Sequence, residues 1–249
     1  MKIGAQFYTI RNACKDLESL AESLKRVADI GYTTVQISGT CPFDAQWMKE
    51  QLDINGLQCV LTHTPKDQLA DPVTVCRNHK IFGCQNVGLG IYKFKDGDLQ
   101  ELYNSFLATY GPIAKTIREN GLYFMYHNHD LEFQKLGGQT ILRKLAQEFE
   151  PQEMGFTLDT YWIQKGGADP AQYIRELAGR IPCIHLKDYG YGATMEVVGE
   201  GNINWNGVFN AAADSQVEYM LVEQDDCNGE DPFDCLRRSY AFLKANGFE

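Results

Sequence analysis

Residues 2–38 read KIGAQFYTIRNACKDLESLAESLKRVADIGYTTVQIS and contain one complete strand–helix–strand unit. Residues 2–8 are predicted to form a strand, and apolar side chains at spacings of three and four then predict a helix that Gly31 ends. The β-branched run 33–38 predicts the next strand. A doubly wound open sheet would carry a glycine-rich sequence after its first strand, and residues 6–10 (QFYTI) contain no glycine. The unit therefore favours a (β/α)₈ barrel over the open sheet.

The same alternation of short apolar runs and amphipathic stretches continues to the end of the chain. Further strands are predicted at 58–62, 86–89, 122–126, 155–158, 181–186 and 218–222. Helices are predicted at 44–55, 72–82, 98–120, 139–149, from near 170, and at 205–213 and 232–245, with a glycine-rich loop at 189–204. Strands that are apolar throughout are typical of parallel sheets buried on both faces. We therefore predict a single (β/α)₈ TIM-barrel domain over residues 1–249, a length typical of this fold.

Composition excludes several classes of partner. The chain has 23 Lys+Arg against 33 Asp+Glu, a net charge of −10, which disfavours binding to nucleic-acid backbones. No apolar run is long enough to cross a membrane, and no signal peptide is visible at the N-terminus. The eight cysteines show no zinc-site spacing and are expected to be reduced. We expect a cytoplasmic protein with neither nucleic-acid nor membrane partners, and a homodimer if it self-associates.

Polar residues collect where the predicted strands end, which is where a (β/α)₈ barrel places its active site. Four of the five histidines fall at these positions: His63, His127, His129 and His185. Three carboxylates accompany them: Glu132, Asp159 and Glu223. The steps from Glu132 to Asp159, His185 and Glu223 are 27, 26 and 38 residues, each about one strand–helix unit. Oxygen and nitrogen ligands without thiolates suit Mn²⁺, Mg²⁺, Co²⁺ or Zn²⁺. The alternative is that these side chains only hydrogen-bond loops at the barrel mouth.

Several short motifs carry a family resemblance that spans nearly the whole chain. They are QFYTIR (6–11), YHNHDLEF (126–133), LDTYW (158–162), HLKD (185–188), VGEGNINW (198–205) and VEQD (222–225). With these motifs the chain resembles the sugar phosphate isomerase/epimerase family. This family belongs to the xylose-isomerase-like barrel superfamily, which also includes inosose dehydratase and apurinic-site endonucleases. The resemblance implies that Asp159, His185 and Glu223 are metal ligands.

One position departs from the family pattern. Many epimerases of this superfamily carry a glutamate at the end of the fifth strand, where it is both a metal ligand and a proton-transfer group. Here His127 holds that position, and the nearest carboxylates are Asp130 and Glu132. We favour Glu132 as the replacement ligand, because a loop can fold it back over the barrel mouth, with His127 as the alternative.

The resemblance implies a divalent-metal-dependent isomerase or epimerase that acts on a ketose or related small carbohydrate through an enediolate. Glu223 is the first choice for the base, with Glu132 as a further proton-transfer carboxylate. His129 or Lys187 would deliver a proton to oxygen, although Lys187 would instead neutralise nearby carboxylates in an alternative interpretation. The residues expected to contact substrate are Gln6, His63, His127, Trp162 and Glu200, the last in a loop that would close over the ligand.

Other functions stay open. The same enediolate can expel a substituent, so a dehydratase or lyase, of the inosose dehydratase type or acting on 3-oxo-glycosides, is the second hypothesis. A catalytically silent sugar-binding barrel is the third. An endonuclease is disfavoured by the negative charge. No glycine-rich phosphate cradle is evident in the last loops, which favours an unphosphorylated substrate.

Overall fold

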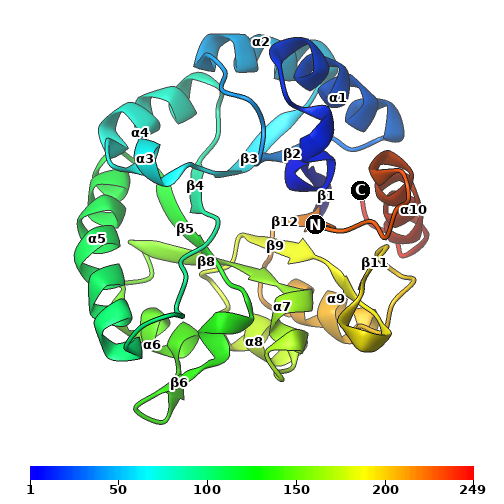
Figure 1. Cartoon of the computed structure of the whole chain (residues 1–249). Helices are drawn as coiled ribbons and strands as arrows, with labels where there is room; N and C mark the ends of the chain where they lie inside the picture. Colours follow the sequence, from blue (N-terminus) through cyan, green and yellow to red (C-terminus); the bar gives the residue numbers. More distant parts are fainter.

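A computed structural model describes residues 1–249 and shows a closed barrel of eight parallel strands inside a ring of helices (Figure 1). Around the barrel the strands are β1 (Lys2–Gln6), β2 (Thr34–Ile37), β3 (Gln58–His63), β4 (Asn86–Leu89), β5 (Tyr123–His127), β8 (Met154–Asp159), β9 (Cys183–Leu186) and β12 (Tyr219–Val222). The barrel closes where β1 pairs in parallel with β12. The predicted (β/α)₈ barrel is confirmed.

The helices cover the outer face of the barrel. They are α1 (Leu17–Ile30), α2 (Ala45–Asn55), α3 (Lys66–Leu69), α4 (Pro72–Ile81), α5 (Leu99–Glu119), α6 (Ile141–Glu148), α7 (Thr160–Lys165), α8 (Pro170–Glu176), α9 (Trp205–Asp214) and α10 (Pro232–Ala245). Side-chain caps explain why several helices begin where they do. The Asp16 carboxylate accepts a hydrogen bond from the Ser19 amide at the start of α1, and the Asp231 side chain caps α10 in the same way. Gly31 and Gly56 end α1 and α2 with positive φ angles of 118° and 62°, which glycine adopts without strain.

The structure differs from the prediction at three places near the carboxyl ends of the strands: one strand is shorter, and additional short elements follow two others. The first strand stops at Gln6 rather than Tyr8, because the Gln6 side chain accepts a hydrogen bond from the Tyr8 amide and starts the 3₁₀ helix η1 (Phe7–Ala13). Helix α7 was not predicted. Further short elements, the 3₁₀ helix η2 (Asp130–Phe133) and the hairpin β6 (Lys135–Leu136) with β7 (Gln139–Thr140), follow β5.

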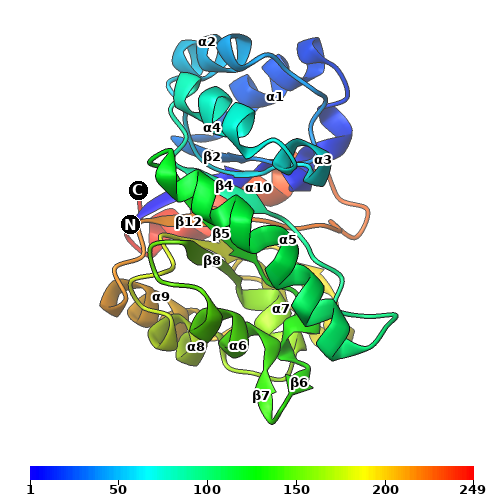
Figure 2. The ribbon, with the colours of Figure 1, turned by 90° about the vertical axis from the view of Figure 1, so that its left-hand side faces the viewer.

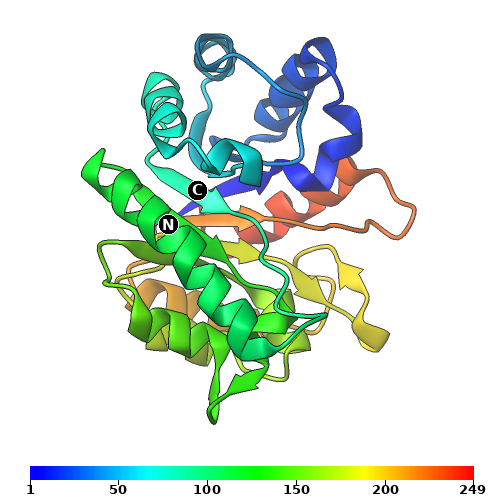
Figure 3. The same ribbon diagram turned by 60° about the vertical axis from the view of Figure 1, so that its left-hand side comes forward.

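The segment after β9 is anchored although its sequence suggests a plain loop. It contains the short antiparallel pair β10 (Asp188–Tyr189) and β11 (Met195–Glu196) around the 3₁₀ turn η3 (Tyr191–Ala193). The buried Asp188 carboxylate accepts hydrogen bonds from the amides of Gly199 (2.8 Å) and Gly201 (3.1 Å) and from the Trp205 indole (2.7 Å). In Figure 3 this segment and the β12–α10 loop both project from the end toward which the strand arrows point. The Asp188 side chain thus holds the rim of the barrel mouth.

The two ends of the chain meet at one place on the barrel (Figure 2), where the Ile3 amide donates to the Glu249 carbonyl at 2.9 Å. All eight cysteines are free, as expected. None of the helices has both the length and the apolar character needed to cross a membrane.

Candidate active site and metal centre

Four side chains from four consecutive barrel strands converge at the carboxyl end of the barrel. His127 ends β5, Asp159 ends β8, His185 lies in β9, and Glu223 directly follows β12. Each offers one ligand atom, and these four atoms lie within 4.8 Å of one another. All four residues are buried. We call these residues, His127, Asp159, His185 and Glu223, the four-residue cluster.

The closest contacts in the cluster join imidazole nitrogens to carboxylate oxygens. His127 Nε2 lies 3.3 Å from Asp159 Oδ2, and His185 Nδ1 lies 2.8 Å from Glu223 Oε2. The crossed distances are longer, 4.0 Å from His127 Nε2 to Glu223 Oε2 and 3.6 Å from His185 Nδ1 to Asp159 Oδ2. One oxygen of each carboxylate and one nitrogen of each imidazole therefore face the same small space.

Surrounding groups fix the orientation of the two imidazoles. The Nδ1 of His127 lies 2.9 Å from the Gly90 carbonyl, which only accepts, so this nitrogen carries the proton and Nε2 turns a lone pair toward the cluster. The Nε2 of His185 lies 2.6 Å from the Gln36 side-chain oxygen, which directs Nδ1 inward. Such outer hydrogen bonds are typical of metal-ligating histidines.

The two carboxylates are oriented in the same way. One Asp159 oxygen accepts from the Trp162 amide at 3.1 Å as the cap of α7, which leaves Oδ2 for the cluster. The Glu223 Oε1 atom accepts from the Gln6 amide group at 2.5 Å, which leaves Oε2 buried and turned toward His185 Nδ1 and Lys187 Nζ, at 2.8 and 3.1 Å. The contact between His185 Nδ1 and Glu223 Oε2 is close but does not have the angles of a hydrogen bond.

The donor set therefore fits a divalent cation. Two imidazole nitrogens and two carboxylate oxygens, with no thiolate, suit Mn²⁺, Co²⁺ or Zn²⁺ by ligand type. His185 Nδ1 and Glu223 Oε2 lie 2.8 Å apart without forming a hydrogen bond, and a cation bound by both atoms would satisfy both of them.

Lys187 supplies a fixed positive charge beside the cluster. Its buried Nζ atom lies 3.3 Å from Asp159 Oδ2, 3.1 Å from Glu223 Oε2 and 2.9 Å from Asp225 Oδ1. Burial by itself would raise the pKa values of Asp159 and Glu223, but Lys187 and the imidazoles hold both below the usual range. Burial likewise disfavours the ammonium form of Lys187, and the three carboxylates outweigh it and raise its pKa. Both cluster carboxylates are therefore ionised at neutral pH.

A cavity of about 340 Å³ opens above the cluster at the carboxyl end of the barrel. Its lining includes five residues expected from the sequence to contact substrate or transfer protons: His63, His127, His129, Lys187 and Glu223. Burial lowers the pKa values of His63 and His129, so both imidazoles are neutral at pH 7. The cavity has the size of a small-molecule site.

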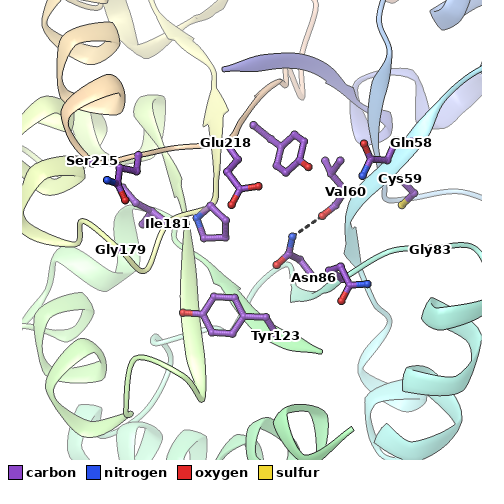
Figure 4. A pocket seen from close by; sticks show the side chains of 14 residues that line it. Gln58, Cys59, Val60, Gly83, Asn86, Tyr123, Gly179, Ile181, Ser215 and Glu218 are labelled. Carbon is purple, nitrogen blue, oxygen red and sulfur yellow. Dashed lines mark hydrogen bonds between the residues drawn. The ribbon is translucent and has the colours of Figure 1, made fainter. Parts of the chain in front are cut away.

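A second hollow of about 450 Å³ lies at the opposite end of the barrel, between the amino ends of the strands (Figure 4). Glu218 is its only charged lining residue, and the Asn86 side chain that points into it already donates to the Val60 carbonyl at 2.8 Å. It contains no histidine and a single carboxylate, and the group of side chains that could hold a metal lies at the other end of the barrel. The chemistry of the molecule is therefore concentrated at the carboxyl end.

Comparison with known proteins agrees with this geometry. The model of the family described as xylose isomerase-like TIM barrel matches residues 24–245. The chain belongs to this family. This match confirms the resemblance to xylose-isomerase-like barrels that the sequence motifs carry.

The similar proteins of this family include dehydratases and epimerases. An inosose dehydratase of Bacillus cereus (strain AH820) is 25% identical over 153 residues, which cover 59% of this chain and 49% of the relative, so the chain spans about half the length of the curated relatives it matches. A solved sugar phosphate isomerase/epimerase of Parabacteroides distasonis ATCC 8503 superposes with a TM-score of 0.82 at 21% identity, over 99% of this chain and 94% of that one. A D-psicose 3-epimerase of Clostridium cellulolyticum H10, solved with D-tagatose, gives a TM-score of 0.74 at 16% identity, over 98% and 99% of the two chains. These structural likenesses show the shared barrel fold.

Within this barrel, Glu132 does not take the position that we favoured for it. Its side chain is buried under the β5 loop, where one oxygen accepts from the Tyr126 hydroxyl and the other from the His129 amide at 2.7 Å. His127, the alternative, completes the four-residue cluster instead. The reason is local: His127 is the last strand residue and its ring turns into the barrel, whereas Glu132 folds back to cap η2.

The buried Glu132 carboxyl gives a pH-dependent prediction. Burial raises its pKa to about 8, although hydrogen bonds from Tyr126 and His129 oppose this shift. Between the unfolded value of about 4.3 and the folded value, the folded protein binds more protons than the unfolded chain, so the free energy of unfolding falls as pH rises. Replacing Glu132 with Gln removes this titration. From pH 5 to pH 8 we expect wild type to lose stability relative to Glu132→Gln by on the order of 3 kcal/mol, measured by urea unfolding.

The control for this measurement is Glu148→Gln, which changes an exposed carboxylate on α6. Its unfolding free energy should follow that of wild type across the pH range. Parallel curves for wild type and Glu132→Gln would contradict a raised pKa at Glu132.

Of the other residues that were expected to contact substrate, two lie near the cavity and one lies away from it. Gln6 holds Glu223, and Trp162 packs on His129 with ring centroids 4.9 Å apart, but neither lines the cavity. Glu200 is exposed and pairs with Arg238 at 3.1 Å, and the closure of its loop over a ligand stays a prediction.

Two residues that contribute to the site were not singled out from the sequence. Gln36 orients His185, and Asp225 completes the carboxylate surroundings of Lys187. The sequence marks Gln36 only by its long polar side chain inside the otherwise β-branched strand TTVQIS. Asp225 stands at a strand end among four acidic or amide residues, 223–226, and sequence alone does not show which of them turns inward.

Proposed function

We propose that this protein is a divalent-metal-dependent isomerase or epimerase of a small, unphosphorylated carbohydrate. The observation that carries the proposal is the buried four-residue cluster at the carboxyl end of a xylose isomerase-like barrel, directly below a cavity of sugar-like size. The solved barrels that superpose on this chain include proteins described as epimerases, which supports the same class of reaction.

The cluster residues would hold the cation through His127 Nε2, Asp159 Oδ2, His185 Nδ1 and Glu223 Oε2. When bound, a divalent ion supplies Lewis-acid stabilisation of the negative charge that develops on a substrate oxygen as a proton leaves the neighbouring carbon. The protein's own contribution is to hold these four side chains by outer hydrogen bonds, so that little reorganisation accompanies the reaction.

Glu223 is the proposed base. Its carboxylate is ionised, its Oε1 atom is fixed by Gln6, and it lines the cavity. Lys187 keeps its charge beside three carboxylates, which supports a neutralising role rather than proton delivery. His129 lines the cavity as a neutral imidazole and is the proposed group that exchanges a proton with a substrate oxygen.

A second candidate is a dehydratase or lyase, and the identity of the β5 residue favours it. An epimerase with two proton-transferring carboxylates needs one on each side of the reacting carbon, whereas β5 delivers the imidazole of His127. A substrate carbanion that is not reprotonated can instead lose a substituent from the next carbon. The inosose dehydratase relatives agree with this alternative.

Solvent-deuterium incorporation tests both candidates. Protein reconstituted with Mn²⁺ would be incubated in D₂O with a panel of ketoses and 3-oxo-sugars, and the products analysed by NMR and mass spectrometry. We expect deuterium next to the carbonyl, with an epimer or isomer as product in the first case and loss of water or an alcohol in the second. Glu223→Gln should lower the rate by about 10³-fold, within the range for general acid–base groups.

Glu148→Gln is the matched control, because Glu148 is an exposed carboxylate on α6 that does not line the cavity. Its rate should equal that of wild type. Neither exchange nor elimination with any substrate, in protein shown to hold its metal, would refute both reactions and leave a sugar-binding barrel.

A further inference from the structure

Glu132 is a fully buried carboxyl group that contacts a residue of the cavity lining and has no part in the proposed reaction. One of its oxygens accepts a hydrogen bond from the Tyr126 hydroxyl, and the other accepts from the backbone N–H of His129 at 2.7 Å. Tyr126 lies in β5, and His129 lies just beyond the end of that strand. The carboxyl group therefore bridges the strand and the segment that follows it.

The Tyr126 end of this bridge is fixed in the core between β5 and α5. The Tyr126 side chain is fully buried, and its ring packs edge-on against that of Phe106, with centroids 5.1 Å apart and planes at 74°. Phe106 is itself fully buried in α5. Because closely packed rings have little freedom to shift, the Tyr126 hydroxyl gives Glu132 a rigid point of attachment.

The His129 end of the bridge lies at the cavity. Pairing between β5 and β8 ends with His127 and Thr157, so the sheet does not hold His129. The hydrogen bond to Glu132 holds its backbone N–H instead. The His129 ring lines the cavity and lies next to His127 and Trp162, at centroid distances of 4.7 and 4.9 Å. The backbone that carries this ring is thus anchored by Glu132.

A carboxyl group suits this task because both of its oxygens accept hydrogen bonds, whereas the amide of glutamine has a single acceptor. Glu132 forms no ion pair. The titratable groups around it are Tyr126, His129 and Asp130, and Asp130 pairs with Lys165 of α7 at 3.3 Å. Burial raises the pKa of Glu132 to about 8, so the charge of the bridge changes within a pH range that can be studied in the folded protein.

We propose that Glu132 is a positioning residue, which fixes the backbone of His129 against Tyr126 and so holds the His129 imidazole in place to exchange a proton with the substrate. This inference rests on the proposed function and adds to it a residue that acts through His129. The competing interpretation is that Glu132 only stabilises η2, with no effect on proton exchange beyond its effect on folding.

NMR of the Zn²⁺-loaded protein tests the bridge without any substrate. The chain has five histidines, so labelling with ¹⁵N-histidine gives five backbone amide signals, and the signal that His129→Ala removes belongs to His129. A charged acceptor forms a stronger hydrogen bond than a neutral one. We therefore expect the His129 amide proton to move downfield as pH rises through about 8 in wild type and in the control Glu148→Gln, and not in Glu132→Gln.

Tyr126→Phe tests the other end of the bridge. The hydrogen bond from Tyr126 lowers the pKa of Glu132, so its removal should move the midpoint of the His129 amide titration to higher pH. An unchanged midpoint, or a His129 amide that titrates in the same way in Glu132→Gln, would overturn the proposal. Circular dichroism and thermal melting check that each variant is folded.

A double-mutant cycle tests whether Glu132 acts through His129. The measured quantity is the rate of deuterium incorporation at saturating substrate, for the ketose or 3-oxo-sugar that exchanges fastest. His129→Ala should lower this rate by about 100-fold. Glu132→Gln should lower it by about 10-fold and leave the substrate affinity unchanged, because a small misplacement of a reacting group is costly. In the double variant we expect no loss beyond that of His129→Ala.

Independent effects would instead multiply to about 1,000-fold in the double variant, and this result, or a wild-type rate in Glu132→Gln, would reject the positioning role. These outcomes are separable from the outcome for the reaction itself. Deuterium exchange that is insensitive to Glu132→Gln would keep the proposed function and reject the role of Glu132. A titrating His129 amide in a protein that exchanges no substrate would keep the bridge and reject both the proposed function and the positioning role.

Discussion

Changing Asp159 and His185 together to alanine is expected to remove the bound divalent cation. The wild-type chain should hold about one Mn²⁺, Co²⁺ or Zn²⁺ after reconstitution and desalting, measured by elemental analysis. The double variant loses one oxygen and one nitrogen ligand of the four-residue cluster. Because losing even an outer partner of a ligand weakens metal affinity by about 10–100-fold, the loss of two ligands should lower it by well over about 100-fold.

Glu200→Ala, the exposed variant outside the cluster, should keep the full metal content. The visible spectrum of the Co²⁺ form gives an independent readout of ligation by nitrogen and oxygen. Near-zero metal in wild type after reconstitution with all three ions would contradict the metal centre. Equal metal content in wild type and in a folded double variant would place the ion elsewhere.

Lys187→Met is expected to destabilise the metal-free protein strongly. The substitution leaves Asp159, Glu223 and Asp225 close together in the barrel without their buried counter-charge. Removing one partner of a buried ion pair typically costs about 3–5 kcal/mol of unfolding free energy. Urea unfolding in the presence of a chelator measures this loss directly.

The same substitution should cost less when the cluster holds a divalent cation, because the ion supplies positive charge to two of the three carboxylates. The comparison is unfolding with saturating Mn²⁺ against unfolding with chelator. Lys165→Met, at a half-exposed lysine that pairs with Asp130 at 3.3 Å, should change the unfolding free energy by less than about 1 kcal/mol in both conditions. An equal loss for Lys187→Met with and without metal would show that the cation and Lys187 do not share the same carboxylates.

The barrel itself followed from hydrophobic periodicity. Every predicted strand lies within two residues of an observed one at each end, because strands buried on both faces need apolar side chains at nearly every position. The helices that cover them carry their own capping residues, such as Asp16 and Gly31 for α1. Helix α7 was missed because its start depends on Asp159, a residue that also belongs to the site.

The site was only partly predictable. Asp159, His185 and Glu223 stand at strand ends, where the parallel barrel forces side chains from neighbouring strands to meet. The fourth member was ambiguous, because the sequence HNHDLE places two histidines and two carboxylates within six residues of the β5 end. Which of them turns inward depends on the strand pleat and on η2, whose capping bonds occupy Glu132.

Sequence by itself thus determined the barrel, the end that carries the chemistry and three members of the cluster, since these depend on periodicity and on the order of residues along single strands. The tertiary structure alone decided that His127 replaces Glu132, that Glu200 faces Arg238, and that Lys187 lies among three carboxylates. These outcomes depend on side-chain direction and on contacts between segments far apart in the chain. Local pattern carries no information about either.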